Sequence, residues 1–275
     1  MSVKFVAASS TRLSWAPGTT FRPVYPWTVG FWCRPALTGT LRTMWFFGNP
    51  AAVDEWVRIN QTAANLWGIG WGPGGAEVNE TWGTVVAGEW THILCRFISA
   101  TNRRYSALKL NGGFEQGAFS ASLAVEVTIT TETLGCKDLA TDIDFFDGDL
   151  AEFFYCTDDI GILATANVDR SLHAKIAFEG PLSYPPMVYK LREYWSFRAG
   201  FRQLSPPDVK FLTQHVHIWT PSATPPDAVG PNPPLMMRDE RSRRALLGKA
   251  PAAPPVDLGD DGLSVIRLRQ RQMSW

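Results

Sequence analysis

The sequence lacks any apolar run of the roughly 20 residues that a membrane-spanning helix needs. Its first ten residues, MSVKFVAASS, contain one lysine and no apolar core. We therefore expect that they are not a secretory signal and that the protein is made in a cytosol. Cysteine is also scarce, because four cysteines in 275 residues stand apart and none forms a Cys-x-x-Cys pair. We therefore expect reduced, buried cysteines rather than disulfides or metal ligands.

The short motifs of common enzymes are missing as well. There is no Gly-x-Ser-x-Gly and no His-Glu-x-x-His, and the glycine-rich stretch GIGWGPGG at 68–75 is not followed by the Lys-Ser or Lys-Thr of a phosphate-binding loop. An excess of one charge is missing too, since 26 Lys and Arg balance 26 Asp and Glu. A chain without net charge has no bulk attraction for nucleic acid or an anionic membrane.

Aromatic residues, in contrast, are abundant. The chain has 12 Trp and 16 Phe and is 45% hydrophobic, which is typical of a folded protein with a large core. Short apolar runs separated by turn residues recur over 3–156, and one of them, PWTVGFWCRP at 26–35, places Val29, Phe31 and Cys33 on one face. About ten to twelve strands result, which predicts an antiparallel sandwich or barrel.

The junction between this run and the next, LRTMWFFG at 41–48, contains Gly39 and Thr40. Such a junction is typical of a hairpin, in which two neighbouring strands turn back on one another. We therefore expect the runs at 26–35 and 41–48 to pair side by side.

A turn rich in Asp and Gly leads into the last run of this region, DIDFFDGDLAEFFYC at 142–156. We expect a buried strand that closes the sandwich. Strict alternation predicts Phe153 and Tyr155 on one face, with Leu150 and Phe154 on the other.

The pattern changes after residue 156. Apolar residues spaced four apart predict a helix over 166–178, whereas VYKLREYW at 188–195 is compatible with a helix or a strand. From residue 204 the chain is rich in proline and cannot build its own core.

The expected fold is therefore all-β. We divide it into an antiparallel β-sandwich over 1–160, a helical or irregular trailer packed on it over 161–204, and an extended Pro-rich arm over 205–275. Because the arm has no core, we expect partner chains to hold it.

Two groups of carboxylates are candidates for calcium binding and for glycoside hydrolysis. The Asp-rich loop makes Asp142, Asp144 and Asp147 weak calcium candidates, although the EF-hand spacing fails and the carboxylates could equally accept backbone hydrogen bonds in a tight turn. The spacing Asp147-x-Asp149-x-x-Glu152 is similar to that of jelly-roll glycoside hydrolases, but it lies in the last predicted strand. We expect neither an enzyme nor a cofactor.

Binding residues are expected at loops and in the arm. Trp15 and Trp71 border loops and are the candidates for ligand contact. We expect partner contacts from the histidine, aromatic and arginine residues of the arm, namely His215, His217, Trp219, Arg238, Arg241, Arg243, Arg244, Arg267, Arg269, Arg271 and Trp275. Interspersed acidic residues argue against nucleic acid as that partner, and no cysteine or carboxylate completes a zinc set beside the two histidines.

Five segments, in order, resemble the laminin-G-like, concanavalin A-like jelly roll: WTVGFWCRP, FFGN, GEWTHILCRF, YSALKLNG and FFDGDLAEFFYCTDDI. Downstream, YPPMVYKLREYWSF and HIWTPSATPPDAVGPNPPLM are similar to the trailer and Pro-rich ending of such proteins in tailed bacteriophages. The calcium-binding members pair an Asp with an Asn from a second loop, and that pairing is not found here.

The resemblance implies a glycan- or protein-binding module that is often displayed on a virion. The leading hypothesis is a structural protein of the phage capsid or tail surface, made in the host cytoplasm, oligomeric, anchored by its arm to other virion proteins and able to aid adhesion to host glycans. The alternatives are a free carbohydrate-binding lectin and, third, a jelly-roll glycoside hydrolase.

Overall fold

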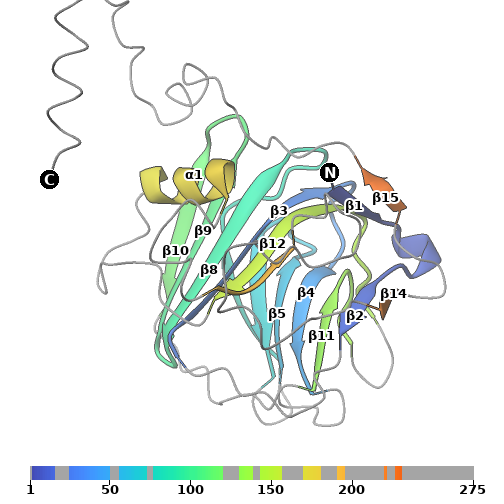
Figure 1. The fold of residues 1–275 in the computed structure, drawn as a ribbon, viewed down its shortest axis with the longest axis horizontal. Helices are drawn as coiled ribbons and strands as arrows, with labels where there is room; N and C mark the ends of the chain where they lie inside the picture. The colour runs from blue at the N-terminus through green and yellow to red at the C-terminus, as the bar shows by residue number, and fades with distance from the viewer. Residues whose placement is uncertain are drawn as a thin grey trace, which may run out of the picture.

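The computed structural model describes residues 2–15, 25–49, 56–72, 77–119, 130–138, 143–156, 170–180, 191–195, 220–221 and 227–230. Two antiparallel sheets pack face to face, and one α-helix lies outside them (Figure 1). The all-β sandwich predicted from the sequence is therefore confirmed.

Sheet A has eight strands. In spatial order they are β10 (Phe114–Phe119), β9 (Asn102–Lys109), β8 (Thr91–Ser99), β3 (Trp27–Pro35), β12 (Gly148–Cys156), β1 (Ser2–Phe5) and β15 (Asp227–Gly230), while β13 (Leu191–Trp195) pairs with β12. The helix α1 (Arg170–Glu179) lies over the outer face of this sheet (Figure 1).

Sheet B has seven strands. Their order is β14 (Thr220–Pro221), β2 (Leu13–Trp15), β11 (Thr131–Leu134), β4 (Arg42–Gly48), β5 (Trp56–Gln61), β6 (Trp67–Trp71) and β7 (Val78–Trp82). A single 3-10 turn, η1 (Ala7–Ser9), connects β1 to β2 and so leads from sheet A to sheet B.

Aromatic side chains fill the space between the sheets. Trp27 of β3 stacks on Phe97 of β8 with ring centroids 3.6 Å apart, and Trp45 of β4 meets Trp27 from the opposite sheet. The face of β3 predicted to point inward does so, since Val29, Phe31 and Cys33 all belong to the core. The four cysteines are buried and free, as expected.

The strand β12 lies in the middle of sheet A, between β3 and β1. The predicted alternation along it is wrong, because Leu150 shares the core face with Phe153 and Tyr155. The register against β3 shifts between Ala151 and Phe154, and Glu152 adopts a left-handed conformation with φ of 50°. One extra residue forms a β-bulge there, and it reverses the faces of everything that follows.

The predicted hairpin between 26–35 and 41–48 is also wrong. The first run, β3, lies in sheet A, and the second, β4, pairs with β5 and β11 in sheet B. The residues between them cross from one sheet to the other, and Gly39 takes the positive φ of 81° that this sharp turn requires.

The chain after β12 returns to the sandwich several times. The predicted helix is α1, and the segment compatible with helix or strand contains β13. The described parts of the arm over 205–275 are β14, paired with β2, and β15, paired with β1. Neither described helix is long and apolar enough to cross a membrane.

Candidate functional site

The outer face of sheet B is shaped by glycines. In β6 the sequence WGIGW alternates, so that Trp67, Ile69 and Trp71 enter the core while the glycines face outward. A Cβ on Gly70 would lie 3.0 Å from Arg58 Nε. Because that space is empty, the outward side chains of the neighbouring strand β5 lie flat across β6.

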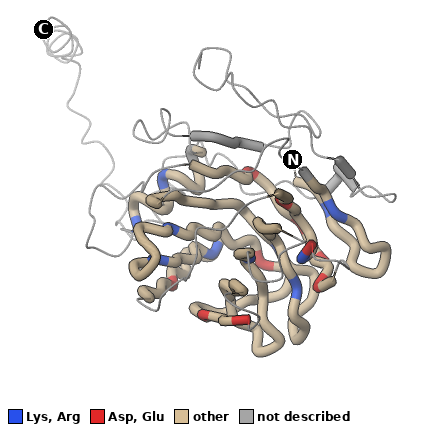
Figure 2. The backbone as a smooth tube through the Cα atoms, turned by 90° about the horizontal axis from the view of Figure 1, so that it is seen from below, with Lys and Arg blue, Asp and Glu red and all other residues tan. Residues whose placement is uncertain are grey.

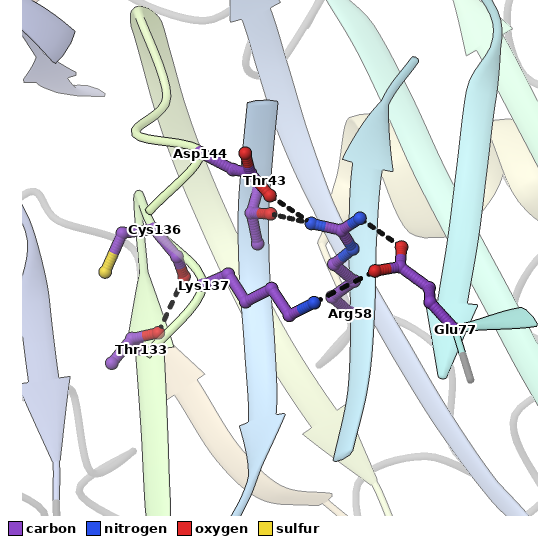
Figure 3. Close-up of polar contacts among 7 residues, drawn as sticks. All are labelled: Thr43, Arg58, Glu77, Thr133, Cys136, Lys137 and Asp144. Atoms are coloured by element: carbon purple, nitrogen blue, oxygen red, sulfur yellow. Dashed lines mark hydrogen bonds and ion pairs between the residues drawn. The ribbon is translucent and has the colours of Figure 1, made fainter. Parts of the chain in front are cut away.

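Four charged residues meet on this face, and we call them the ionic cluster: Arg58, Glu77, Lys137 and Asp144 (Figure 3). Arg58 of β5 binds Asp144 through Nη1 at 2.5 Å and Glu77 through Nη2. Lys137 donates from Nζ to Glu77 Oε2 at 2.9 Å. The Lys137 ammonium also lies 3.8 Å from the ring centroid of Trp56, a cation–π contact.

A loop between β11 and β12 brings two of the four residues to the cluster. Lys137 and Ile143 form an isolated bridge across the loop, and Thr43 of β4 donates its backbone N–H to the Asp144 carbonyl. Asp144 has a left-handed φ of 55°, which a short Asp side chain tolerates. Docking against β4 therefore carries the Asp-rich turn to Arg58, which is distant in sequence (Figure 3).

The cluster keeps its acidic groups at the surface and its basic groups below. Arg58 and Lys137 are almost fully buried, whereas the side chains of Glu77 and Asp144 are 27% and 21% exposed. Burial alone would raise the pKa of Glu77, but Arg58 and Lys137 outweigh it and hold that pKa below its ordinary value. Burial and the Arg58 charge lower the pKa of Lys137.

Some buried polar atoms of this face have no partner. The side-chain amide of Asn60, two residues beyond Arg58 on β5, makes no hydrogen bond in the described part of the chain, and neither does Arg58 Nε. Within the described residues, these buried groups are therefore unsatisfied polar atoms beneath the face.

A second charged group lies inside the sandwich. Arg103 of β9 binds Glu80 of β7 at 2.5 Å and Tyr105 at 2.9 Å, which links the two sheets through the interior. The Arg103 guanidinium lies 4.9 Å from the ring of Trp71. Burial raises the pKa of the Tyr105 hydroxyl well above its usual range.

Trp71 is therefore not the exposed loop residue that the sequence suggests. Its side chain is 3% exposed, because β6 continues through the glycines and turns this residue into the core against Arg103. The other ligand candidate, Trp15, is the last residue of β2, and its side chain lies outside the described structure.

The carboxylates proposed for calcium or hydrolysis have basic neighbours. Asp144 is bound by Arg58, and Asp149 by Arg34 at 2.8 Å. Burial raises the pKa of Asp149 in spite of Arg34. Asp142 lies outside the described residues, within which no group of three or more metal-binding side chains comes together.

The expected partner-binding residues of the arm are not in the described part of the chain, so their role stays a prediction. They are His215, His217, Trp219, Arg238, Arg241, Arg243, Arg244, Arg267, Arg269, Arg271 and Trp275. Over the described backbone, basic and acidic positions are interspersed (Figure 2).

Sequence reasoning missed Arg58, Glu77 and Lys137. A signal for Arg58 was present, since WVRINQ places Trp56, Arg58 and Asn60 on one face of a strand beside the alternating Trp-Gly run. Glu77 and Lys137 reach the cluster only because the loops that carry them pack against sheet B, and no local sequence pattern predicts that packing.

No protein-family model matches the chain, and no curated protein does. Solved structures with a similar fold include laminin-G-like and pentraxin-like jelly-roll sandwiches. One is a heptameric pentraxin from Limulus polyphemus, with a TM-score of 0.41 and 13% identity over 57% of this chain and 71% of that one.

Two further solved structures have comparable TM-scores and sequence identities. The CBM40 of the Ruminococcus gnavus IT-sialidase, bound to α2,3-sialyllactose, has a TM-score of 0.42 and 11% identity over 55% of this chain and 93% of that one. The enzymatically active domain of tailspike protein 2 from bacteriophage CBA120 has a TM-score of 0.45 and 14% identity over 71% of this chain but 31% of that one.

Proposed function

We propose that this protein is a non-catalytic carbohydrate-binding β-sandwich whose sugar site is the outer face of sheet B. The observation that carries the proposal is the arrangement of Glu77 and Asp144, two partly exposed carboxylates held on different nitrogens of the single guanidinium of Arg58. Their positions are fixed before any ligand arrives, which lowers the entropic cost of binding.

A sugar hydroxyl suits such a site. Each carboxylate has about four lone-pair positions, of which the ion pairs use only part, so both can still accept hydroxyl protons. Hydrogen bonds to ionised groups are about twice as strong as neutral ones. Arg58 and Lys137 support the carboxylates from below and keep Glu77 ionised.

The same electrostatics favour binding over hydrolysis. A glycosidase needs one carboxyl group protonated near neutral pH to donate to the leaving oxygen. Glu77 has a pKa below its ordinary value, so it is a poor general acid. Asp149, in the spacing similar to that of hydrolases, is 3% exposed at its side chain and is held by Arg34.

Glycan binding by single-site variants tests the proposal. The wild-type protein is expected to select a set of glycans on an array, and Glu77→Gln and Asp144→Asn are each expected to weaken that binding at least ~10-fold by removing one charged acceptor. Glu89→Gln, a change outside the ionic cluster, is the control and should bind like wild type. Absence of any specific glycan for the wild type contradicts the proposal.

The finer proposal is that this module is displayed on a phage virion, in the capsid or tail, through its C-terminal arm. It is supported by the order of the laminin-G-like segments and by the coreless, Pro-rich composition of 205–275. In a particle, deletion of 235–275 is expected to prevent incorporation while the sandwich stays folded. Unchanged incorporation rules out anchoring by this part of the arm.

A further inference from the structure

Three polar side chains form a continuous hydrogen-bonded chain beneath α1. Ser106 Oγ of β9 lies 2.9 Å from His173 Nδ1, and His173 Nε2 lies 2.8 Å from His92 Nδ1. His173 comes from the helix, whereas Ser106 and His92 come from neighbouring strands of sheet A. The chain therefore connects α1 to the sheet through polar contacts in an otherwise apolar layer.

Aromatic rings enclose the two imidazoles. Trp32 meets His92 edge-on at 5.2 Å, and Phe114 meets His173 edge-on at 5.7 Å. Phe154 of β12 stacks on His92 from a third strand. Both histidines are at most 1% exposed.

Charged groups of the packed elements lie elsewhere on this face. They are Arg34 of β3, Arg96 of β8, Arg104 of β9, Asp149 and Glu152 of β12, and Arg170 and Lys175 of α1. None of them makes a hydrogen bond or an ion pair with either imidazole. Among the side chains that the structure describes, no carboxylate bonds to an imidazole in a way that would stabilise a protonated ring.

The hydrogen bond between the two rings also limits their charge. One of the two facing nitrogens must be bare, because two N–H groups cannot bond to one another. A first proton would be an unpaired charge in an apolar layer, and a second would break the bond. A docked α1 is thus compatible with neutral histidines.

We propose that the Ser106–His173–His92 chain is an acid-sensitive latch, which holds α1 on sheet A near neutral pH and releases it in acid. Release exposes the apolar side chains that α1 covers, among them Trp32, Trp90 and Leu108. The latch lies on the outer face of sheet A and is independent of the proposed sugar site on sheet B.

The pKa values of the two histidines decide whether acid strengthens or weakens the docking of α1. Burial lowers the pKa of His173 to about 3 in the docked state, and burial with the His173 charge lowers the pKa of His92 well below its usual range. In the released state both return to about 6.5. The released state therefore binds more protons below about pH 6.5, and docking weakens as the pH falls through that value.

Amide hydrogen exchange of α1 in the intact protein, corrected for intrinsic exchange rates, measures the opening equilibrium of the helix between pH 7.5 and 4.5. With two protons taken up on release, the opening equilibrium is expected to rise by up to ~100-fold per pH unit below about pH 6. His173→Gln, which bonds but does not titrate, should reduce the rise to ~10-fold or less per unit. His215→Gln/His217→Gln is the control and should keep the full dependence.

A second measurement covers the case in which His173→Gln does not fold. Proton NMR of the wild-type histidine rings should show two imidazoles that stay neutral in the docked state and titrate only as α1 exchange accelerates. Opening that is independent of pH, or dependence that disappears in the His215→Gln/His217→Gln control, overturns the proposal.

Discussion

At the scale of single residues, Arg103 depends on its neighbours to balance its buried charge. It is fully buried between the sheets and is bonded by Glu80, Tyr105 and the Ala100 carbonyl. A buried ion pair contributes little compared with an apolar pair of the same size, but removing one partner leaves the other charge unpaired. The cost of losing Glu80 should therefore far exceed that of losing an exposed acid.

We expect Glu80→Gln to lower the free energy of unfolding by ~3 kcal/mol, because a neutral amide cannot balance the guanidinium. Tyr105→Phe, which removes the hydrogen bonds of the hydroxyl with Arg103 and Glu80, should cost ~2 kcal/mol. Urea denaturation measures both, with Glu89→Gln as a surface control that should change stability by less than ~0.5 kcal/mol. A loss for Glu80→Gln no larger than the control value would mean that the ion pair does not hold the sheets together.

Gly70 lies beside the ionic cluster, in the proposed sugar site. An alanine Cβ there would lie 2.8 Å from Asn79 Oδ1 and 3.0 Å from both Arg58 Nε and Glu77 Oε1. These are ends of flexible side chains, so Gly70→Ala should leave stability within ~1 kcal/mol of wild type but displace the cluster and weaken glycan binding. Gly113→Ala, which likewise meets only side chains, is the matched control in the β9–β10 turn.

The sequence singled out Asp144 only as a weak calcium candidate. An Asp-rich loop is equally suited to a metal ion and to a guanidinium, and only the strand that lies beside it decides between them. Arg58 is that neighbour, and it is 86 residues away along the chain. Likewise His92 and His173, 81 residues apart, show no local pattern that predicts their contact.

At the scale of elements, α1 is also held by hydrogen bonds that do not titrate. Arg170 of α1 donates to the Gly112 carbonyl at 2.6 Å. Trp32 Nε1 donates to the Ala177 carbonyl at 2.9 Å. Trp32→Phe removes this bond, leaves the carbonyl unpaired and should raise the opening of α1 about 5-fold, a cost of ~1 kcal/mol. Hydrogen exchange should show the same factor at pH 7.5 and at pH 4.5, whereas a factor that varies with pH would tie Trp32 to the latch.

The alternation along β12 could be predicted only as far as Ala151. Beyond it, the bulge at Glu152 returns Phe153 and Tyr155 to the core face. A glycine would have signalled the left-handed conformation, but this position holds a charged residue with φ of 50°. Burial of Phe153 and Tyr155 in the core therefore outweighs the preference of Glu152 for a right-handed backbone conformation.

At the scale of the whole molecule, the sequence over 3–156 predicted the presence of the strands, but it did not predict which of the two sheets each strand joins. Alternation along 26–35 and 41–48 identifies two strands without indicating that they lie in different sheets. A turn containing Gly39 serves a hairpin and a crossing equally well. Which one forms depends on pairing with β5, β11 and β12, strands made later in the chain.

The described parts of the arm cover one edge of each sheet. β15 pairs with β1 in sheet A, and β14 pairs with β2 in sheet B. Deletion of 205–275 should expose both edges and promote association, because an unpaired edge strand is a template for another chain. Light scattering measures this, and deletion of 235–275, which keeps both strands, is the control that should stay dispersed.

The pairing of β1 has a consequence for synthesis of the chain. Val3 pairs with Leu150, and Ser2 pairs with Gly230, so β1 has neither of these partners until β12 has been made. At a translation rate of about 5–20 residues per second, Val3 and Phe5 wait for roughly 7–30 s before β12 emerges. During that interval β12 does not yet cover the two apolar side chains of β1, so this segment would be open to a chaperone that binds apolar residues.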